Sequence, residues 1–65
     1  MKEIYTIVRR DDTMNEYYFE TLAEAVQYCA ENELSNEYYR ICKILEENGC
    51  EVGCLAIYNT NGERE

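Results

Sequence analysis

The sequence predicts a single α+β domain: a four-stranded antiparallel sheet in the chain order β-β-α-β-β, with one helix packed on one face. Three observations predict this fold class. Two β-rich runs flank a turn near the N-terminus, a helix with a capping sequence follows, and a hairpin signal separates two further β-rich runs. We assign residues 1–58 to the domain and residues 59–65 to a flexible C-terminal tail.

The first two strands form a predicted hairpin. Residues 2–10 (KEIYTIVRR) are rich in β-branched and aromatic side chains, and they are apolar on both faces near the centre. That pattern is typical of a strand inside a sheet. Residues 11–15 have the composition of a turn, and residues 16–20 (EYYFE) return as a short second strand.

A helix is predicted from Thr21 to about Asn32. Thr21 and Glu24 have the spacing of a capping box, in which the Thr oxygen accepts from a free backbone N–H and the Glu side chain reaches back. An apolar stripe at helical spacing follows, formed by Leu22, Ala25, Val26 and Cys29. Residues 33–36 form a polar connection in which Leu34 is expected to point inward.

Residues 38–48 allow two interpretations. Their apolar positions fit a helix that Ser35 would cap and Gly49 would end. Asn48-Gly49 is also the strongest two-residue hairpin signal, and that register pairs Leu45 with Val52, Ile41 with Ala56, Tyr39 with Tyr58 and, at some cost, Glu46 with Glu51. We favour the hairpin, because the β-rich run 50–58 needs a neighbouring strand.

Net charge is concentrated in one stretch of the chain. Residues 11–39 contain eight acids and no Lys or Arg, and the whole chain has a net charge of −8. Glu20 and Glu24 are explained by the positive end of the helix dipole. Glu31 and Glu33 lie near the opposite end, where a cation is favoured by about 0.3–1 kcal/mol. One-sided charge of this kind indicates a partner of opposite sign.

Catalytic and metal-binding signatures are missing from the sequence. It has no histidine, no glycine-rich phosphate loop and one serine without a partner base, so we expect neither an enzyme nor a cofactor. The four cysteines are spaced C-x12-C-x7-C-x3-C, and only Cys50 and Cys54 have the spacing of a zinc ligand pair. The hairpin register also predicts that Cys42 points away from these two, which argues against one tetrahedral site. We therefore expect no metal.

The N-terminus lacks the apolar region of a signal peptide, and no apolar run approaches the roughly 20 residues of a membrane span. We expect a cytoplasmic protein with no membrane partner, whose cysteines are reduced and mostly act as small hydrophobes. The acidic charge also argues against direct binding to nucleic acid, which would repel it.

Seven tyrosines and Phe19 form the second unusual feature. They include the doublets Tyr17-Tyr18 and Tyr38-Tyr39, and a doublet in a strand places one ring on each face. One helix covers one face, so we expect several rings on the uncovered face. These rings either stabilise the sheet through cross-strand pairs or form an interface. The interface would bind a partner protein or a second copy of this chain in a homodimer.

The function predicted from these features is that of a small acidic, non-enzymatic protein-binding module. In size, acidity and lack of catalytic motifs the chain is similar to phage-encoded inhibitors of host defence, such as anti-CRISPR proteins and DNA mimics. The resemblance implies an inhibitor of a basic, nucleic-acid-binding protein. The predicted partner-binding residues are Asp11, Asp12, Glu16, Tyr18, Glu20, Glu24, Tyr28, Glu31, Glu33 and Tyr38. The alternatives are an accessory protein that self-associates through a tyrosine-rich sheet face, and a zinc or redox protein that uses the cysteines.

Overall fold

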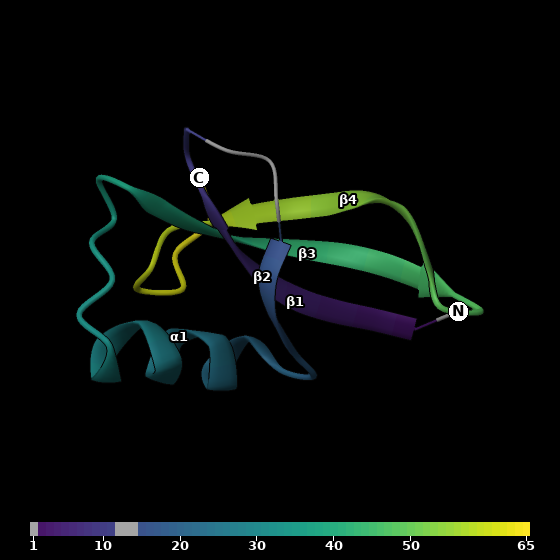
Figure 1. The fold of residues 1–65 in the computed structure, drawn as a ribbon, viewed down its shortest axis with the longest axis horizontal. Helices are drawn as coiled ribbons and strands as arrows, with labels where there is room; N and C mark the ends of the chain where they lie inside the picture. Colours follow the sequence, from purple (N-terminus) through teal and green to yellow (C-terminus); the bar gives the residue numbers. More distant parts are fainter. Residues whose placement is uncertain (1, 12–14) are drawn as a thin grey trace.

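Four antiparallel strands and one helix form the molecule, which confirms the predicted fold class (Figure 1). The computed structural model describes residues 2–11 and 15–65, and the side chains of Asn15 and Glu16 lie outside that description. The elements are β1 (Lys2–Arg9), β2 (Asn15–Phe19), α1 (Leu22–Glu31), β3 (Tyr39–Glu47) and β4 (Cys50–Tyr58). The strand order is β2-β1-β3-β4, so the two long strands with the most buried residues are the central ones.

The helix begins and ends as the sequence predicts. The Glu24 amide donates to Thr21 Oγ1 at 3.2 Å, and the Thr21 hydroxyl donates to Glu24 Oε1 at 3.0 Å. This pairs the side chain of Glu24 with the Thr21 hydroxyl, where the capping box predicted the Thr21 amide. Asn32 caps the C-terminal end, and Leu34 packs into the core beneath the helix.

The hairpin interpretation of residues 38–48 is confirmed. Asn48 and Gly49 both have positive φ, 52° and 81°, as a two-residue turn between twisted strands requires. Next to the turn the predicted register also holds, because Glu46 lies opposite Glu51.

Farther from the turn the predicted register is wrong. Two irregularities, between Leu45 and Glu46 and between Lys43 and Ile44 of β3, each add one extra residue on β4. Leu45 therefore lies opposite Gly53 instead of Val52, and Ile41 lies opposite Tyr58 instead of Ala56. A β-bulge has this effect because it sets two residues of one strand against one of its neighbour, which also bends the strand.

The face of the sheet beneath α1 is aromatic. Ile7 and Ile41 lie at its centre, both fully buried, and contact Ala25 and Cys29 of the helix. The rings packed around this cluster are Tyr5, Phe19, Tyr28, Tyr39 and Tyr58. Our prediction that several rings lie on the uncovered face is therefore wrong, since Tyr18 is the one strand ring there among the described residues. The strands' alternation places all the other strand rings on the helix side.

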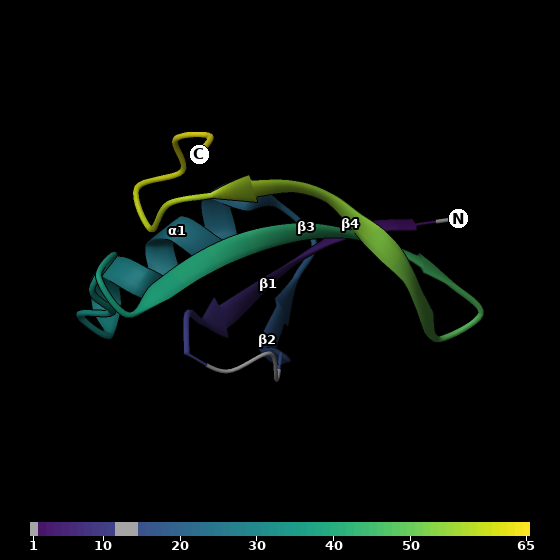
Figure 2. The same ribbon diagram turned by 90° about the horizontal axis from the view of Figure 1, so that it is seen from above.

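The opposite face of the sheet is aliphatic and concave. Ile4, Val8, Cys42 and Ile44 are buried there without a helix above them, and Ile57 packs against them. Figure 2 shows how this happens: the end of the β3–β4 hairpin bends toward the side away from α1. The bulges produce that bend, so the sheet covers its second apolar face by its own curvature.

The last seven residues fold back onto the domain. Arg64 forms a bridge with Tyr58, the Glu65 amide donates to the Ile57 carbonyl at 3.0 Å, and the Arg10 guanidinium pairs with the Glu65 carboxylate. Thr60 is buried, and Gly62 lies against Val26 with φ of 87°. These contacts attach to the domain the segment that we predicted to be a flexible C-terminal tail.

Candidate protein-binding surfaces

The acids of this chain fall into two groups according to whether a cation lies beside them. Asp11 pairs with Arg9 at 3.2 Å and Glu20 pairs with Lys2 at 3.1 Å. Glu3 pairs with Lys43 at 3.3 Å, and Glu65 pairs with Arg10. Within the described ranges, Glu24, Glu31 and Glu33 have no cation within ion-pair distance. Among the described residues, the structure therefore pairs four acids with cations and leaves both acids of the helix, along with Glu37, Glu46, Glu47 and Glu63, without one.

Two of the unpaired acids share one side of α1. Glu24 and Glu31 are seven residues apart, which is about two helical turns, with Gln27 and Tyr28 between them on the same side. Together with Phe19 of β2 they line a shallow hollow of about 230 Å³. We call these five residues the helix surface.

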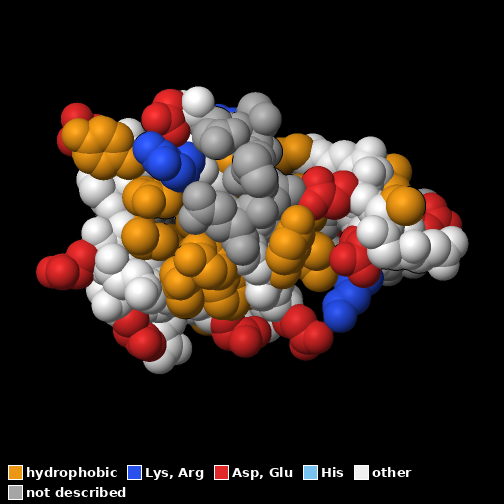
Figure 3. All heavy atoms as spheres, viewed as in Figure 1, with side chains coloured by type: hydrophobic (Ala, Val, Ile, Leu, Met, Phe, Trp, Pro, Cys, Tyr) orange, Lys and Arg blue, Asp and Glu red, His pale blue; other side chains and the backbone are white. Residues whose placement is uncertain are grey.

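Aromatic packing fixes the position of Tyr28 within the helix surface. Its ring centroid lies 4.6 Å from that of Tyr17 and 5.5 Å from that of Phe19, both tilted. Tyr17 remains 41% exposed, so the cluster reaches the surface. Figure 3 shows hydrophobic side chains gathered between α1 and β2, with acidic side chains along the helix edge of that patch. The helix surface thus combines two unpaired carboxylates with a rigid aromatic base.

The structure separates the remaining predicted binding residues. Tyr18 is 55% exposed but lies on the face opposite α1, and Tyr38 is 58% exposed in the connection before β3. Glu33 follows the helix in a left-handed conformation, with φ of 53°. Asp12 and the side chain of Glu16 lie outside the described residues. Of the ten predicted residues, Glu24, Tyr28 and Glu31 are the ones that form one compact surface on the helix.

Phe19 and Gln27 of this surface, and Tyr17 beside it, were not among the predicted partner-binding residues. Gln27 could have been found from helical spacing alone, because it is three residues after Glu24 and four before Glu31. Tyr17 and Phe19 are two residues apart on β2, so both side chains lie on the face toward the helix.

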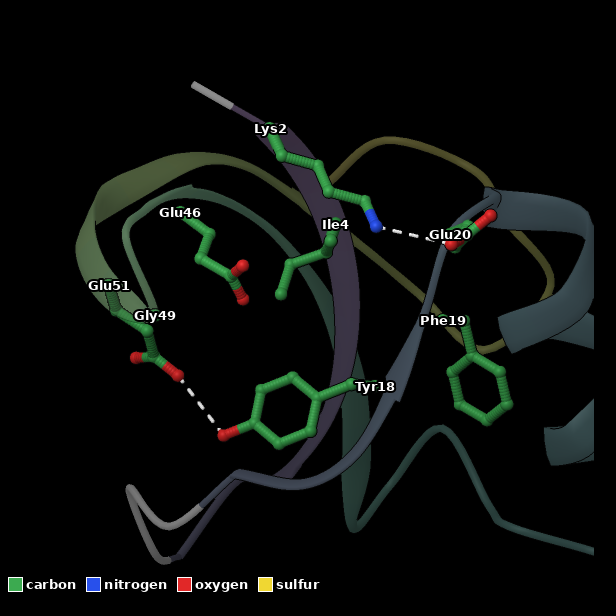
Figure 4. Close-up of a pocket in the computed structure, with 8 residues that line it drawn as sticks. All are labelled: Lys2, Ile4, Tyr18, Phe19, Glu20, Glu46, Gly49 and Glu51. Atoms are coloured by element: carbon green, nitrogen blue, oxygen red, sulfur yellow. Dashed lines mark hydrogen bonds and ion pairs between the residues drawn. The ribbon is translucent and has the colours of Figure 1, made fainter.

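A second hollow, of about 500 Å³, lies at the hairpin end of the concave face (Figure 4). Tyr18 spans part of it, since its hydroxyl donates to Glu51 Oε1 at 3.1 Å. This bond joins β2 to β4, the two edge strands of the sheet. Figure 4 also shows the neighbouring ring of Phe19 pointing to the other side of β2. Lys2, Glu20 and Glu46 complete the polar lining, and the Lys2–Glu20 pair neutralises one of its carboxylates.

A third hollow, of about 410 Å³, lies farther along the same concave face and contains sulfur. Cys42, Cys54, Arg40 and Glu51 line it together with Gly53 and aliphatic side chains. Burial raises the pKa of the Cys42 thiol, the neighbouring Cys54 raises it further, and Arg40 lowers it. The bulge next to Leu55 brings Cys54 to the face that holds Cys42. The predicted opposite orientation of these two cysteines, one of our arguments against zinc, is therefore wrong.

Two polar atoms of the concave face are buried without a hydrogen-bond partner among the described residues. They are Thr6 Oγ1, on a side chain with no exposed area, and Arg40 Nε. An unpaired buried polar group costs about 1–3 kcal/mol.

Metal, membrane and similarity comparisons add no assignment. Within residues 2–11 and 15–65, no group of three or more Cys, Asp or Glu side chains is placed to hold a metal ion. Within the same ranges, no helix has the length and apolar character needed to cross a bilayer. No protein-family model matches the chain, and neither a curated protein nor a solved structure is significantly similar to it.

Proposed function

We propose that this chain is a non-enzymatic protein-binding module that presents its helix surface to a basic surface of a partner protein. The observation that carries the proposal is the pair Glu24 and Glu31, which flank an aromatic hollow and have no cation beside them among the described residues. Binding to these carboxylates breaks no ion pair inside the chain, so the whole electrostatic gain is available to the partner.

The aromatic base of the helix surface supports the same proposal. A Lys or Arg side chain that approaches Glu24 or Glu31 can lay its aliphatic stem against Tyr28 and Phe19. The cation itself is attracted to the ring faces by about 0.5–2 kcal/mol. Because Tyr28 is held by two neighbouring rings, it loses little freedom when a partner binds. Rigid aromatic side chains of this kind are typical energetic anchors of interfaces.

The partner that fits best is a protein whose basic groove binds nucleic acid. Glu24 and Glu31 are about 10.5 Å apart along the helix axis at about 1.5 Å per residue. Duplex DNA presents one charge per about 1.7 Å of axis, on both sides of a rigid rod. A rigid acidic helix can occupy part of such a groove and compete with nucleic acid. The compositional similarity to phage-encoded inhibitors of host defence supports this version of the proposal.

The proposal is tested by affinity capture from a bacterial lysate on immobilised protein, with duplex DNA as competitor. We expect proteins that the wild type retains, that DNA releases, and that the double variant Glu24→Lys/Glu31→Lys no longer retains. Each charge reversal replaces attraction by repulsion. Because the attraction of the wild type is electrostatic, retention on the wild type should also fall steeply as salt rises.

The matched control is Glu47→Lys/Glu63→Lys, which changes the net charge equally at exposed positions outside the helix surface. It should retain the same proteins as the wild type. If both double variants lose the same proteins, net charge and not the helix surface determines binding. If neither loses them, the proposed surface is wrong.

A further inference from the structure

Two cysteines that are twelve residues apart in the sequence face the same hollow. Cys42 is buried on β3, whereas Cys54 is exposed on β4, and both line the third hollow of about 410 Å³. Cys54 lies opposite Ile44, two residues along β3 from Cys42. The cysteines are thus diagonal neighbours on one face of an antiparallel pair.

The spacing of this pair is close to that of a disulfide. Diagonal neighbours have Cα atoms about 7–8 Å apart in a regular sheet, and a disulfide usually spans about 4.4–6.8 Å. The strand that must move is β4, an edge strand whose neighbour in the sheet is β3 and whose residues 50–55 are exposed. The bulge next to Leu55 already interrupts the pairing between the two cysteines. A shift of about an ångström at an irregular edge is therefore accessible.

The chemical surroundings of the two thiols differ. The Cys54 thiol donates to the Ala56 carbonyl at 3.6 Å and is open to solvent. Burial and the charge of Cys54 raise the pKa of Cys42, while the Arg40 guanidinium beside it lowers that pKa. A glutathione bound to Cys54 removes the neighbouring thiol that raises the pKa of Cys42, and the positive charge of Arg40 still favours the Cys42 thiolate.

We infer that Cys42 and Cys54 form a dithiol site that a small disulfide, such as glutathione disulfide, closes into an intramolecular bond. The inference goes beyond the proposed function and does not depend on it. Closing this bond fixes the bent end of the β3–β4 hairpin and fills part of the concave face, on the side of the sheet opposite the helix surface.

The reaction proceeds in two exchange steps. The Cys54 thiolate attacks one sulfur of glutathione disulfide, whose S–S bond breaks and releases one glutathione thiolate. The Cys42 thiolate then attacks the Cys54 sulfur, the mixed disulfide breaks, and a second glutathione leaves. The chain loses two thiol protons and two electrons, and one glutathione disulfide is reduced to two molecules of glutathione.

The test is to incubate the reduced full chain with glutathione disulfide, alkylate the remaining thiols, and measure intact mass and disulfide-linked peptides. We expect the wild type to yield a peptide pair joined through Cys42 and Cys54, while the exposed Cys50 is free to carry a glutathione of its own. The variant Cys29→Ala/Cys50→Ala keeps only the pair, so it should lose both of its thiols and retain no glutathione.

Two variants separate the steps. Combined with Cys50→Ala, which removes the other exposed thiol, Cys42→Ala should stop at one glutathione bound to Cys54. Cys54→Ala changes an exposed side chain and so keeps the fold, and it should form no intramolecular bond. The inference is overturned by a wild type that keeps glutathione without closing, by a bond that joins Cys50 to Cys54, or by closure in Cys54→Ala.

Discussion

The two faces of this sheet bury similar aliphatic side chains by different means. Beneath α1, Ile7 and Ile41 have no exposed area and are enclosed by a helix and aromatic rings. On the concave face, Ile4 and Ile44 are 6% and 5% exposed, yet both line hollows. A single helix over one face therefore suffices for a 65-residue chain, because the curvature of the sheet buries the second face.

The polar groups of the two faces differ in the same sense. The helix side presents its carboxylates outward to solvent, where a partner can reach them. The concave side holds two buried polar atoms without partners among the described residues, Thr6 Oγ1 and Arg40 Nε, and a pair of neighbouring thiols. We therefore propose partner binding on the helix side and redox chemistry on the concave side.

The largest expected effect comes from removing one isoleucine from each face of the same strand. Ile41→Ala should destabilise the protein by about 4 kcal/mol, because it leaves an enclosed cavity as well as losing apolar burial. Ile44→Ala should cost about 2–3 kcal/mol, mainly the lost burial, because its site opens into a hollow that water enters. Urea denaturation of both variants measures the difference. Equal losses, or a larger loss for Ile44→Ala, would show that the concave face is as tightly enclosed as the helix side.

Two glycines with positive φ, Gly62 and Gly49, differ in how closely other side chains surround them. Gly62 has φ of 87°, and a Cβ there would lie 3.0 Å from Val26 on the helix side. Gly49 has φ of 81° in the hairpin turn, with open space around it. Gly62→Ala should therefore cost about 2 kcal/mol, and Gly49→Ala, which has backbone strain alone, about 1 kcal/mol. Thermal denaturation monitored by circular dichroism compares them. A Gly62→Ala variant as stable as the wild type would mean that residues 59–65 contribute nothing to the domain.

The buried hydroxyl of Thr6 gives a stabilising prediction. Thr6→Val keeps the shape of the side chain and removes a polar atom without a partner among the described residues, so the free energy of unfolding should rise by about 1 kcal/mol. Thr6→Ser is the control: it keeps the hydroxyl and loses a methyl group, and should cost about 0.8 kcal/mol. A loss of stability in Thr6→Val would show that the hydroxyl has a partner.

The smallest expected effect concerns the ion pair that holds the C-terminus. The Arg10 hydrogen bond lowers the pKa of Glu65 below its ordinary value of 4.5. A carboxyl group whose pKa is depressed by folding stabilises the protein above its unfolded pKa, and that contribution disappears as pH falls through the folded pKa. The thermal unfolding temperature of Glu65→Gln should therefore lie slightly below that of the wild type at pH 7 and coincide with it near pH 2. Glu37→Gln, at an exposed position, should match the wild type at both.

Much of the fold could be predicted from the sequence because local signals agreed. The capping box and the apolar stripe predicted the bounds of α1 to within about a residue, and Asn48-Gly49 predicted the position of the second hairpin turn. The bulges of β4 could not be placed, because a slip of register leaves the β-rich pattern of residues 50–58 unchanged. Gly53, an isolated glycine inside a strand, was the one local signal for such an irregularity.

The candidate site was less predictable than the fold. Helical spacing places Glu24, Tyr28 and Glu31 together, but ion pairing depends on which strands are neighbours. Lys2 reaches Glu20 only because β1 lies beside β2, and Arg10 reaches Glu65 only because residues 59–65 fold back onto the domain. Charge counting along the sequence could not separate these paired acids from the unpaired ones on α1. The pairing of Cys42 with Cys54 could not be predicted either, because it depends on the bulge next to Leu55.

The most direct test of the proposed binding surface is an amide chemical-shift map of the protein titrated with a nona-arginine peptide. Two-dimensional NMR should show perturbations concentrated in α1 and β2, around Phe19, Glu24, Tyr28 and Glu31, and added salt should abolish them. The Glu24→Lys/Glu31→Lys variant should lose them. Perturbations concentrated instead at the end of the β3–β4 hairpin, around Glu46 and Glu51, would contradict the assignment of basic-partner binding to the helix surface.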